Sequence, residues 1–291
     1  MTEHIDFELD WARGTDIGLK LVAINVSDIA AMGGRPMRAV ATLHLGDDTD
    51  LDLVEEIAAG MAEAADLWGL GIVGGDIGRG AELNLSMTLL GDVEGAPVMR
   101  SGARVGDAVC VTGALGAAHA GLLLLQVGSV DVANVHAELT GRSGADGLAV
   151  LAARQLRPEP RLQEGIALGS RATAMIDISD GLAIDLERLC VASDVGCEID
   201  AASIPVHPEL GYATDKFDGF PEPLECALAG GEDFELLFTI PEDGLDDAQD
   251  QLDEIGTGVS VIGTITERGR MLDGGPLEQW SERGWDHLRT P

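Results

Sequence analysis

The spacing of apolar side chains along the chain predicts helices and strands in alternation. Residues 15–32, TDIGLKLVAINVSDIAAM, place apolar side chains on one face at helical intervals, and Gly33, Gly34 and Pro36 end this predicted helix. Apolar or alternating segments predict strands at 4–9, 39–45, 69–80, 83–93, 107–113, 174–176, 197–199, within 229–240, and at 259–266. Further helices are predicted at 46–65, 116–125, 182–189 and 241–255, with a loop at 212–222. This mixture indicates the α/β or α+β class, and 291 residues suffice for two domains.

One stretch, AMIDISDGLAIDL at residues 174–186, combines a strand, two acids and a helix start. The apolar strand is followed by Asp177, Ser179 and Asp180, and Gly181 precedes the helical run. Unpaired backbone N–H groups at a helix N-terminus favour phosphate, and Mg²⁺ can join phosphate oxygens to one or two carboxylates. The residues leave two interpretations open: a magnesium–nucleotide site without a P-loop, or a helix that Asp180 merely caps.

The charge of the chain excludes several classes of partner. It has 51 acidic and 18 basic residues, a net charge of -33, and two lysines, Lys20 and Lys216. Such a surface repels nucleic acid and anionic lipid, so we expect neither as a partner. This composition is typical of proteins from a high-salt cytoplasm, where salt screens the repulsion between carboxylates.

Cysteine usage and hydropathy point to the same compartment. Four cysteines lie in apolar contexts without a C-x-x-C pair, which predicts buried thiols in a reducing environment. The sequence has neither a signal peptide nor a run of 18 apolar residues, so we expect a cytoplasmic protein.

Acidic residues recur beside glycine, serine or a helix end at four separated places. They are Asp28, Asp76, the pair Asp177 and Asp180, and the pair Glu232 and Asp233. Together they predict a carboxylate-lined cleft that holds several divalent ions. A P-loop kinase and a protein kinase are excluded because their glycine-rich signatures are missing, and the histidines lack the spacing of zinc ligands.

Six segments, in this order and spacing, resemble thiamine-monophosphate kinase, a family of the aminoimidazole ribonucleotide synthetase superfamily. They are NVSDIAAMGG (25–34), GIVGGDIGRG (71–80), MRSGARVGD (99–107), RPEPRLQEG (157–165), IDISDGLAIDL (176–186) and AGGEDFELLF (229–238). The resemblance covers nearly the whole chain. It implies a two-domain α/β fold, with residues 1–97 as an ATP- and metal-binding domain whose sheet pairs across a homodimer, and residues 98–291 as a C-terminal α/β domain.

The same resemblance implies a reaction and its site. ATP phosphorylates thiamine monophosphate to thiamine diphosphate with several Mg²⁺ ions, and whether K⁺ is also required stays open. Because the attacking phosphate oxygen is already ionised, alignment and charge neutralisation carry the catalysis. The implied metal ligands are Asp28, Asp76, Asp177 and Asp180. The implied ATP contacts are Gly75, Asp76, Arg100 and Ser179. The implied substrate contacts are Glu232 or Asp233, the ring of Trp285, and Asp6 or His4 at the position of a family histidine.

The resemblance also implies ligands upstream of Met1, in a Gly-Asp-Asp motif and a Ser/Thr-Thr-Asp strand. We therefore expect that the printed start is an internal methionine, and that the 291-residue chain alone binds Mg-ATP weakly. Two alternatives stay open. One is another ATP-dependent enzyme of the superfamily, although the terminal cysteines that two of these enzymes need are missing. The other is a non-catalytic ATP-binding regulatory paralogue, which a turnover assay would separate.

Overall fold

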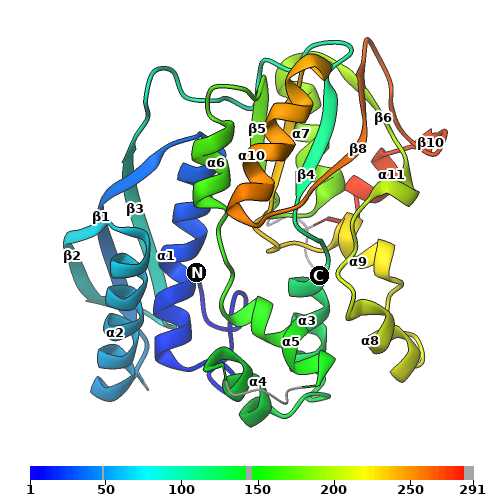
Figure 1. Ribbon diagram of the computed structural model, residues 1–291. Coiled ribbons are helices and arrows are strands. Elements are labelled where there is room, and N and C mark those ends of the chain that lie inside the picture. The colour runs from blue at the N-terminus through cyan, green and yellow to red at the C-terminus, as the bar shows by residue number, and fades with distance from the viewer. Residues whose placement is uncertain (48, 142–145, 285–291) are drawn as a thin grey trace.

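A computed structural model describes residues 1–47, 49–141 and 146–284. Its strands form two sheets (Figure 1). The small sheet has the order β2-β1-β3, in which β1 pairs parallel with β2 and antiparallel with β3. Its strands are β1 (Arg35–Leu45), β2 (Gly71–Arg79) and β3 (Asn84–Asp92).

The large sheet has seven strands in the order β10-β9-β6-β8-β4-β7-β5. Every residue of its central strands β4 and β7 is buried, because helices cover both faces of the sheet. The strands are β4 (Ala108–Thr112), β5 (Ala174–Asp177), β6 (Gly196–Ile199), β7 (Leu236–Ile240), β8 (Val259–Thr266), β9 (Arg270–Leu272) and β10 (Gly275–Pro276). The mixed α/β class that the sequence predicts is confirmed.

Helix α1 (Gly14–Ala31) lies between the two sheets and contacts both. It packs on the small sheet together with α2 (Leu51–Trp68), and its other side contacts α6 and β5 (Figure 1). The contact between α1 and α2 is close because glycines face it. A Cβ at Gly18 would lie 2.1 Å from the carbonyl oxygen of Ile57, and one at Gly60 would lie 2.0 Å from that of Thr15. The predicted helix at 15–32 is thus confirmed.

The remaining helices surround the large sheet and the lower part of α1 (Figure 1). One apolar core runs from the small sheet and α1 into α3, α4 and α5, so it includes residues on both sides of position 97. The remaining helices are α3 (Ala117–Gln126), α4 (Val132–Leu139), α5 (Gly147–Leu156), α6 (Leu162–Leu168), α7 (Leu182–Ser193), α8 (Leu210–Lys216), α9 (Pro223–Ala229), α10 (Leu245–Ile255) and α11 (Glu278–Ser281). No helix in the described ranges is long and apolar enough to cross a membrane.

Two local predictions are wrong, and a third is confirmed. Residues 4–9 form no strand, because the N–H groups of Ile5 and Asp6 both donate to the carbonyl of Thr2 and turn the chain. Helix α8 occupies much of the predicted loop at 212–222, because its apolar side packs on α3 and α5. The prediction for 229–240 is confirmed: the turn and the acidic pair form a loop, and the buried strand β7 follows from Leu236.

Candidate active site

Two loops lie side by side next to α1, and we call them the loop pair: residues 177–180 and residues 230–235. Three backbone hydrogen bonds join them. The N–H of Ile178 donates to the carbonyl of Glu235 (2.8 Å), that of Phe234 to the carbonyl of Ile178 (2.9 Å), and that of Glu232 to the carbonyl of Ser179 (2.9 Å). The predicted acids of both loops therefore belong to one structural unit.

Asp177 ends β5 and meets α1. The hydroxyl of Ser27 donates to its Oδ2 at 2.7 Å, and Asp28 is the next residue on the helix. Burial first, and then the negative charge of Asp28, raise the pKa of Asp177 to about 7, although the Ser27 bond acts to lower it. Partial burial also raises the pKa of Asp28, and the nearby guanidinium of Arg100 opposes that shift. The structure thus brings together three predicted site residues, Asp28, Arg100 and Asp177.

This pair of carboxylates fits a hard divalent cation. Both carboxyls are held where their ionised forms are disfavoured, so added positive charge would stabilise them. Among the residues that the structure describes, no three histidine, cysteine or acidic side chains gather as a ready-made metal cluster. Mg²⁺ does not need one, because it takes one or two carboxylates and completes its shell with phosphate and water.

Asp180 lies in the same loop but has a different partner. Its carboxylate pairs with Arg188 of α7, which also contacts Asp185. Asp185, a residue that the sequence reasoning missed, is buried and accepts the backbone N–H groups of Ser179 and Asp180 at 3.0 Å each. The alternative that Asp180 merely caps the helix is wrong, because α7 begins after Gly181 without a side-chain cap.

The acids of the second loop are each held by a different part of the fold. Glu232 pairs with Lys20 of α1 at 3.0 Å and accepts Nε2 of Gln155 at 2.5 Å. Asp233 accepts the N–H groups at the start of α3, from Gly116 at 2.7 Å and Ala118 at 3.3 Å. Burial raises the pKa of Asp233 to about 7 against these bonds.

A third acid, Glu235, pairs with Arg161, and sequence reasoning missed it. An acid inside the apolar run FELLF was the available signal, since a buried carboxylate needs a partner. The arginines of RPEPR were the candidates, and the second of them is that partner.

The other predicted residues lie further out. Asp76 is exposed on β2 opposite Thr42, and a Cβ at its neighbour Gly75 would lie 1.9 Å from the carbonyl of Ala41. The carboxylate of Asp6 accepts the N–H of Thr2 at 2.6 Å and borders a small cavity that Lys20 and Gln155 also line. Trp285 lies outside the described residues.

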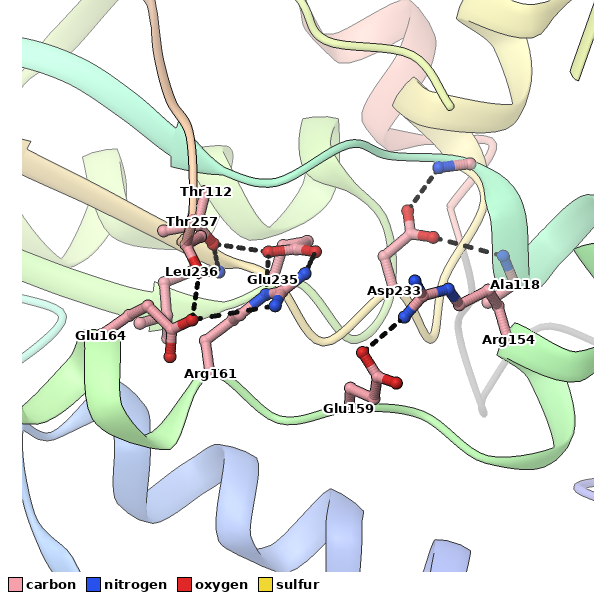
Figure 2. A network of polar contacts seen from close by, with 11 residues as sticks. Thr112, Ala118, Arg154, Glu159, Arg161, Glu164, Asp233, Glu235, Leu236 and Thr257 are labelled. Atoms are coloured by element: carbon pink, nitrogen blue, oxygen red, sulfur yellow. Dashed lines mark hydrogen bonds and ion pairs between the residues drawn. The ribbon is translucent and has the colours of Figure 1, made fainter. Parts of the chain in front are cut away.

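A pocket of about 400 Å³ opens beside the second loop. Its walls carry more acidic than basic side chains, and Figure 2 shows Arg161 and Glu235 on one side with Asp233 and Arg154 on the other. The charged and titratable lining residues are Arg154, Glu159, Arg161, His207, Glu232, Asp233 and Glu235. The pocket is large enough for a small organic molecule and suits one with a positive charge.

Comparisons with known proteins agree with this arrangement. Residues 1–93 match the family model "AIR synthase related protein, N-terminal domain", and residues 104–272 match the corresponding C-terminal domain. The chain is 34% identical to the thiamine-monophosphate kinase of Pyrococcus abyssi, over 96% of this chain and 81% of that one. It is 36% identical to that of Escherichia coli K12, over 95% and 81%.

A solved structure supports the same conclusion. The structure described as AaThiL complexed with AMPPCP and TMP matches with a TM-score of 0.86 and 32% identity, covering 99% of this chain and 85% of that one. Both domain models, the relatives and the fold therefore agree on one assignment. The chain belongs to the thiamine-monophosphate kinase family.

Proposed function

We propose that Asp28 and Asp177 hold Mg²⁺ for the reaction of this family, the ATP-dependent phosphorylation of thiamine monophosphate to thiamine diphosphate. The observation that carries the proposal is the meeting of these two acids between α1 and β5, with Arg100 as their cationic neighbour. Bound Mg²⁺ would neutralise phosphate charge that grows during transfer. We assign Asp76 and Asp180 as further ligands, in keeping with the resemblance of their segments to the family.

The nucleotide phosphates are assigned to the start of α7. Gly181 has φ 122°, so the backbone turns sharply there, and the first N–H groups of the helix have no side-chain cap. These groups favour a bound phosphate. Ser179 lies three residues before the first residue of α7, and Arg100 lies near Asp28. Ser179, Arg100 and the Gly75-Asp76 segment are therefore our proposed ATP contacts.

The substrate contact is assigned to Glu232 rather than Asp233. Both carboxylate oxygens of Asp233 accept backbone N–H groups of α3, so this residue fixes the loop. The Glu232 side chain keeps 28% of its surface exposed and lines the pocket. A carboxylate at that position attracts the cationic thiazolium ring of thiamine monophosphate. Asp6 near Lys20, and Trp285, remain proposed contacts from the resemblance.

The residues of this site would promote the reaction by holding the substrate and the nucleotide in the right orientation. The attacking group is a phosphate oxygen of thiamine monophosphate, which is ionised at neutral pH and needs no strong base. Lys20 and Gln155 orient Glu232, while Ser27 orients Asp177. Reacting groups that are held in line gain much of their rate from this orientation.

We further propose a homodimer through the open face of the small sheet. One face packs on α1 and α2, but the other leaves apolar side chains exposed on all three strands. These residues are Val40, Val73 and Leu90. An apolar sheet face of this kind is typical of an interface between copies.

The proposal is tested by thiamine diphosphate formation from ATP and thiamine monophosphate, with and without the in-frame codons upstream of Met1. Glu232→Gln should raise the KM for thiamine monophosphate at least about tenfold, since a carboxylate facing a cationic substrate is lost. Its control, Glu159→Gln, removes an exposed acid at the mouth of the same pocket. ATP binding without turnover in every form would favour the regulatory paralogue.

A further inference from the structure

Arg161, which is partly exposed, and the buried Glu235 form an ion pair with two hydrogen bonds at the pocket wall. Arg161 precedes α6, and its Nε and Nη2 donate to the two carboxylate oxygens of Glu235 at 2.7 and 2.6 Å (Figure 2). Glu235 is 5% exposed, and its carboxylate also accepts the hydroxyl of Thr112 at 2.6 Å. The same hydroxyl accepts the N–H of Leu236 at 2.8 Å. The side chain and backbone of this segment are thus fixed together at the start of β7.

The surrounding chain leaves a space shaped for this carboxylate. Gly113 has φ 58°, and a Cβ at that position would lie 2.2 Å from Oε1 of Glu235. Arg161 also approaches Glu164 at 3.7 Å, and Glu164 accepts the hydroxyl of Thr257 just before β8. The pair therefore connects the RPEPR segment, β4, β7 and the approach to β8 (Figure 2).

Glu235 also belongs to the loop pair through its backbone. Its carbonyl accepts the N–H of Ile178, one residue after Asp177. The bonds from Phe234 and Glu232 then continue this pairing to Ser179. A displacement of Glu235 would consequently move the loop that contains Asp177 and Asp180, as well as the loop that contains Glu232.

The second loop has a backbone that needs anchors. Glu232 and Phe234 have φ values of 67° and 52°, in the left-handed region that residues other than glycine avoid. This conformation is strained for residues with a side chain, so the loop would relax if its contacts were loosened. Three separate anchors oppose this relaxation: Lys20 at Glu232, the start of α3 at Asp233, and Arg161 at Glu235.

We propose that Arg161, acting through Glu235, is a positioning residue that keeps the loop pair in register for phosphoryl transfer. The role in transfer rests on the proposed function, whereas the anchoring of the loops rests on the contacts above. Arg161 does not need to touch the reacting atoms. It holds the wall from which Glu232 reaches the pocket and the backbone that follows Asp177.

The chain contains a matched control for this proposal. Arg157, the first arginine of RPEPR, donates its Nε to the buried carboxylate of Asp16 at 2.6 Å. Its side chain is 23% exposed, against 21% for Arg161. The Arg157 pair fixes the start of α1 and makes none of the loop-pair contacts. Substitution of either arginine should therefore lower the stability of the fold. Only substitution of Arg161 should also loosen the loop pair.

The experiment compares Arg161→Lys with Arg157→Lys in the full chain. Lysine keeps the charge but cannot form the two parallel bonds. Hydrogen exchange should become at least about tenfold faster at the amides of Ile178, Glu232 and Phe234 in Arg161→Lys alone. Thermal midpoints would measure the loss of stability in each variant. The kcat should fall about tenfold or more in Arg161→Lys and stay near the wild-type value in Arg157→Lys.

A double variant tests whether the two residues act as one unit. Arg161→Lys with Glu235→Gln should lower kcat no further than the more severe single change, because both remove the same pairing. Additive losses, unchanged exchange at the loop amides, or equal kcat losses in Arg157→Lys would each overturn the positioning role. If the wild type lacked turnover, the proposed function would fail. The anchoring would then be decided by loop exchange and by Mg-ATP affinity in the same variants.

Discussion

The sequence contains Gly-Gly followed by an acid twice, and the structure treats the two copies in opposite ways. In residues 230–232 the acid is Glu232, which is held by Lys20 and Gln155 between α1 and α5. In residues 74–76 the acid is Asp76, which lies exposed on β2. Within the described part of the chain, its side chain forms no hydrogen bond or ion pair.

This difference separates two tasks within the proposed site. The loop pair is rigidly preorganised, since its acids have partners before any ligand arrives. In contrast, strand β2 presents the carboxylate of Asp76, for which a ligand or a second copy of the chain would supply the partner. Affinity for Mg-ATP should therefore depend on both regions, while alignment for transfer should depend on the loop pair.

The largest effect should come from the loop pair. Asp177→Asn removes the buried charge between Ser27 and Asp28 but keeps the size of the side chain, so turnover should be lost while the fold remains. Thiamine diphosphate formation and circular dichroism would measure the two quantities. Ser27→Ala, which removes the hydrogen bond but neither acid, should retain measurable activity. Wild-type kinetics in Asp177→Asn would contradict the metal assignment.

A smaller effect is expected on the open strand. Asp76→Asn should weaken Mg-ATP binding by about tenfold or more, since a ligand for the metal would be lost. The thermal midpoint should stay unchanged because Asp76 has no partner among the described residues. Calorimetric titration with Asp52→Asn, an exposed position on α2, provides the control. A lower midpoint would show that β2 depends on Asp76 and that the two regions are less different.

The smallest effect concerns pH. Burial raises the pKa of Asp233 to about 7, so the stability it contributes is full at low pH and is lost as the pH rises from its ordinary value through 7. Asp233→Asn should flatten the fall of the thermal midpoint between about pH 4 and pH 8. Asp131→Asn, which changes the exposed aspartate that caps α4, should leave that slope as it is. Parallel slopes for Asp233→Asn and wild type would refute the buried titration.

Local patterns in the sequence were sufficient for the elements that carry the site. The apolar face and the glycines around α1, and the strand–turn–helix at Asp177, predicted both segments because their signals are short-range. The separate roles of Glu232 and Asp233 could not be predicted. They depend on Lys20 and on the N-terminus of α3, which are more than 100 residues away along the chain. The pairing of Arg161 with Glu235 was not predictable either, because the two residues are 74 positions apart along the chain.

The burial of Lys20 has a practical consequence. The chain has two lysines, and Lys20 is 3% exposed and paired with Glu232, whereas Lys216 is exposed on α8. Of the two lysines, an amine-reactive dye should therefore label Lys216 of the folded chain in strong preference to Lys20. Helix α8 packs against α3 and α5, which contribute walls of the pocket. A fluorophore attached there would lie on a helix beside the pocket that we propose for the substrate.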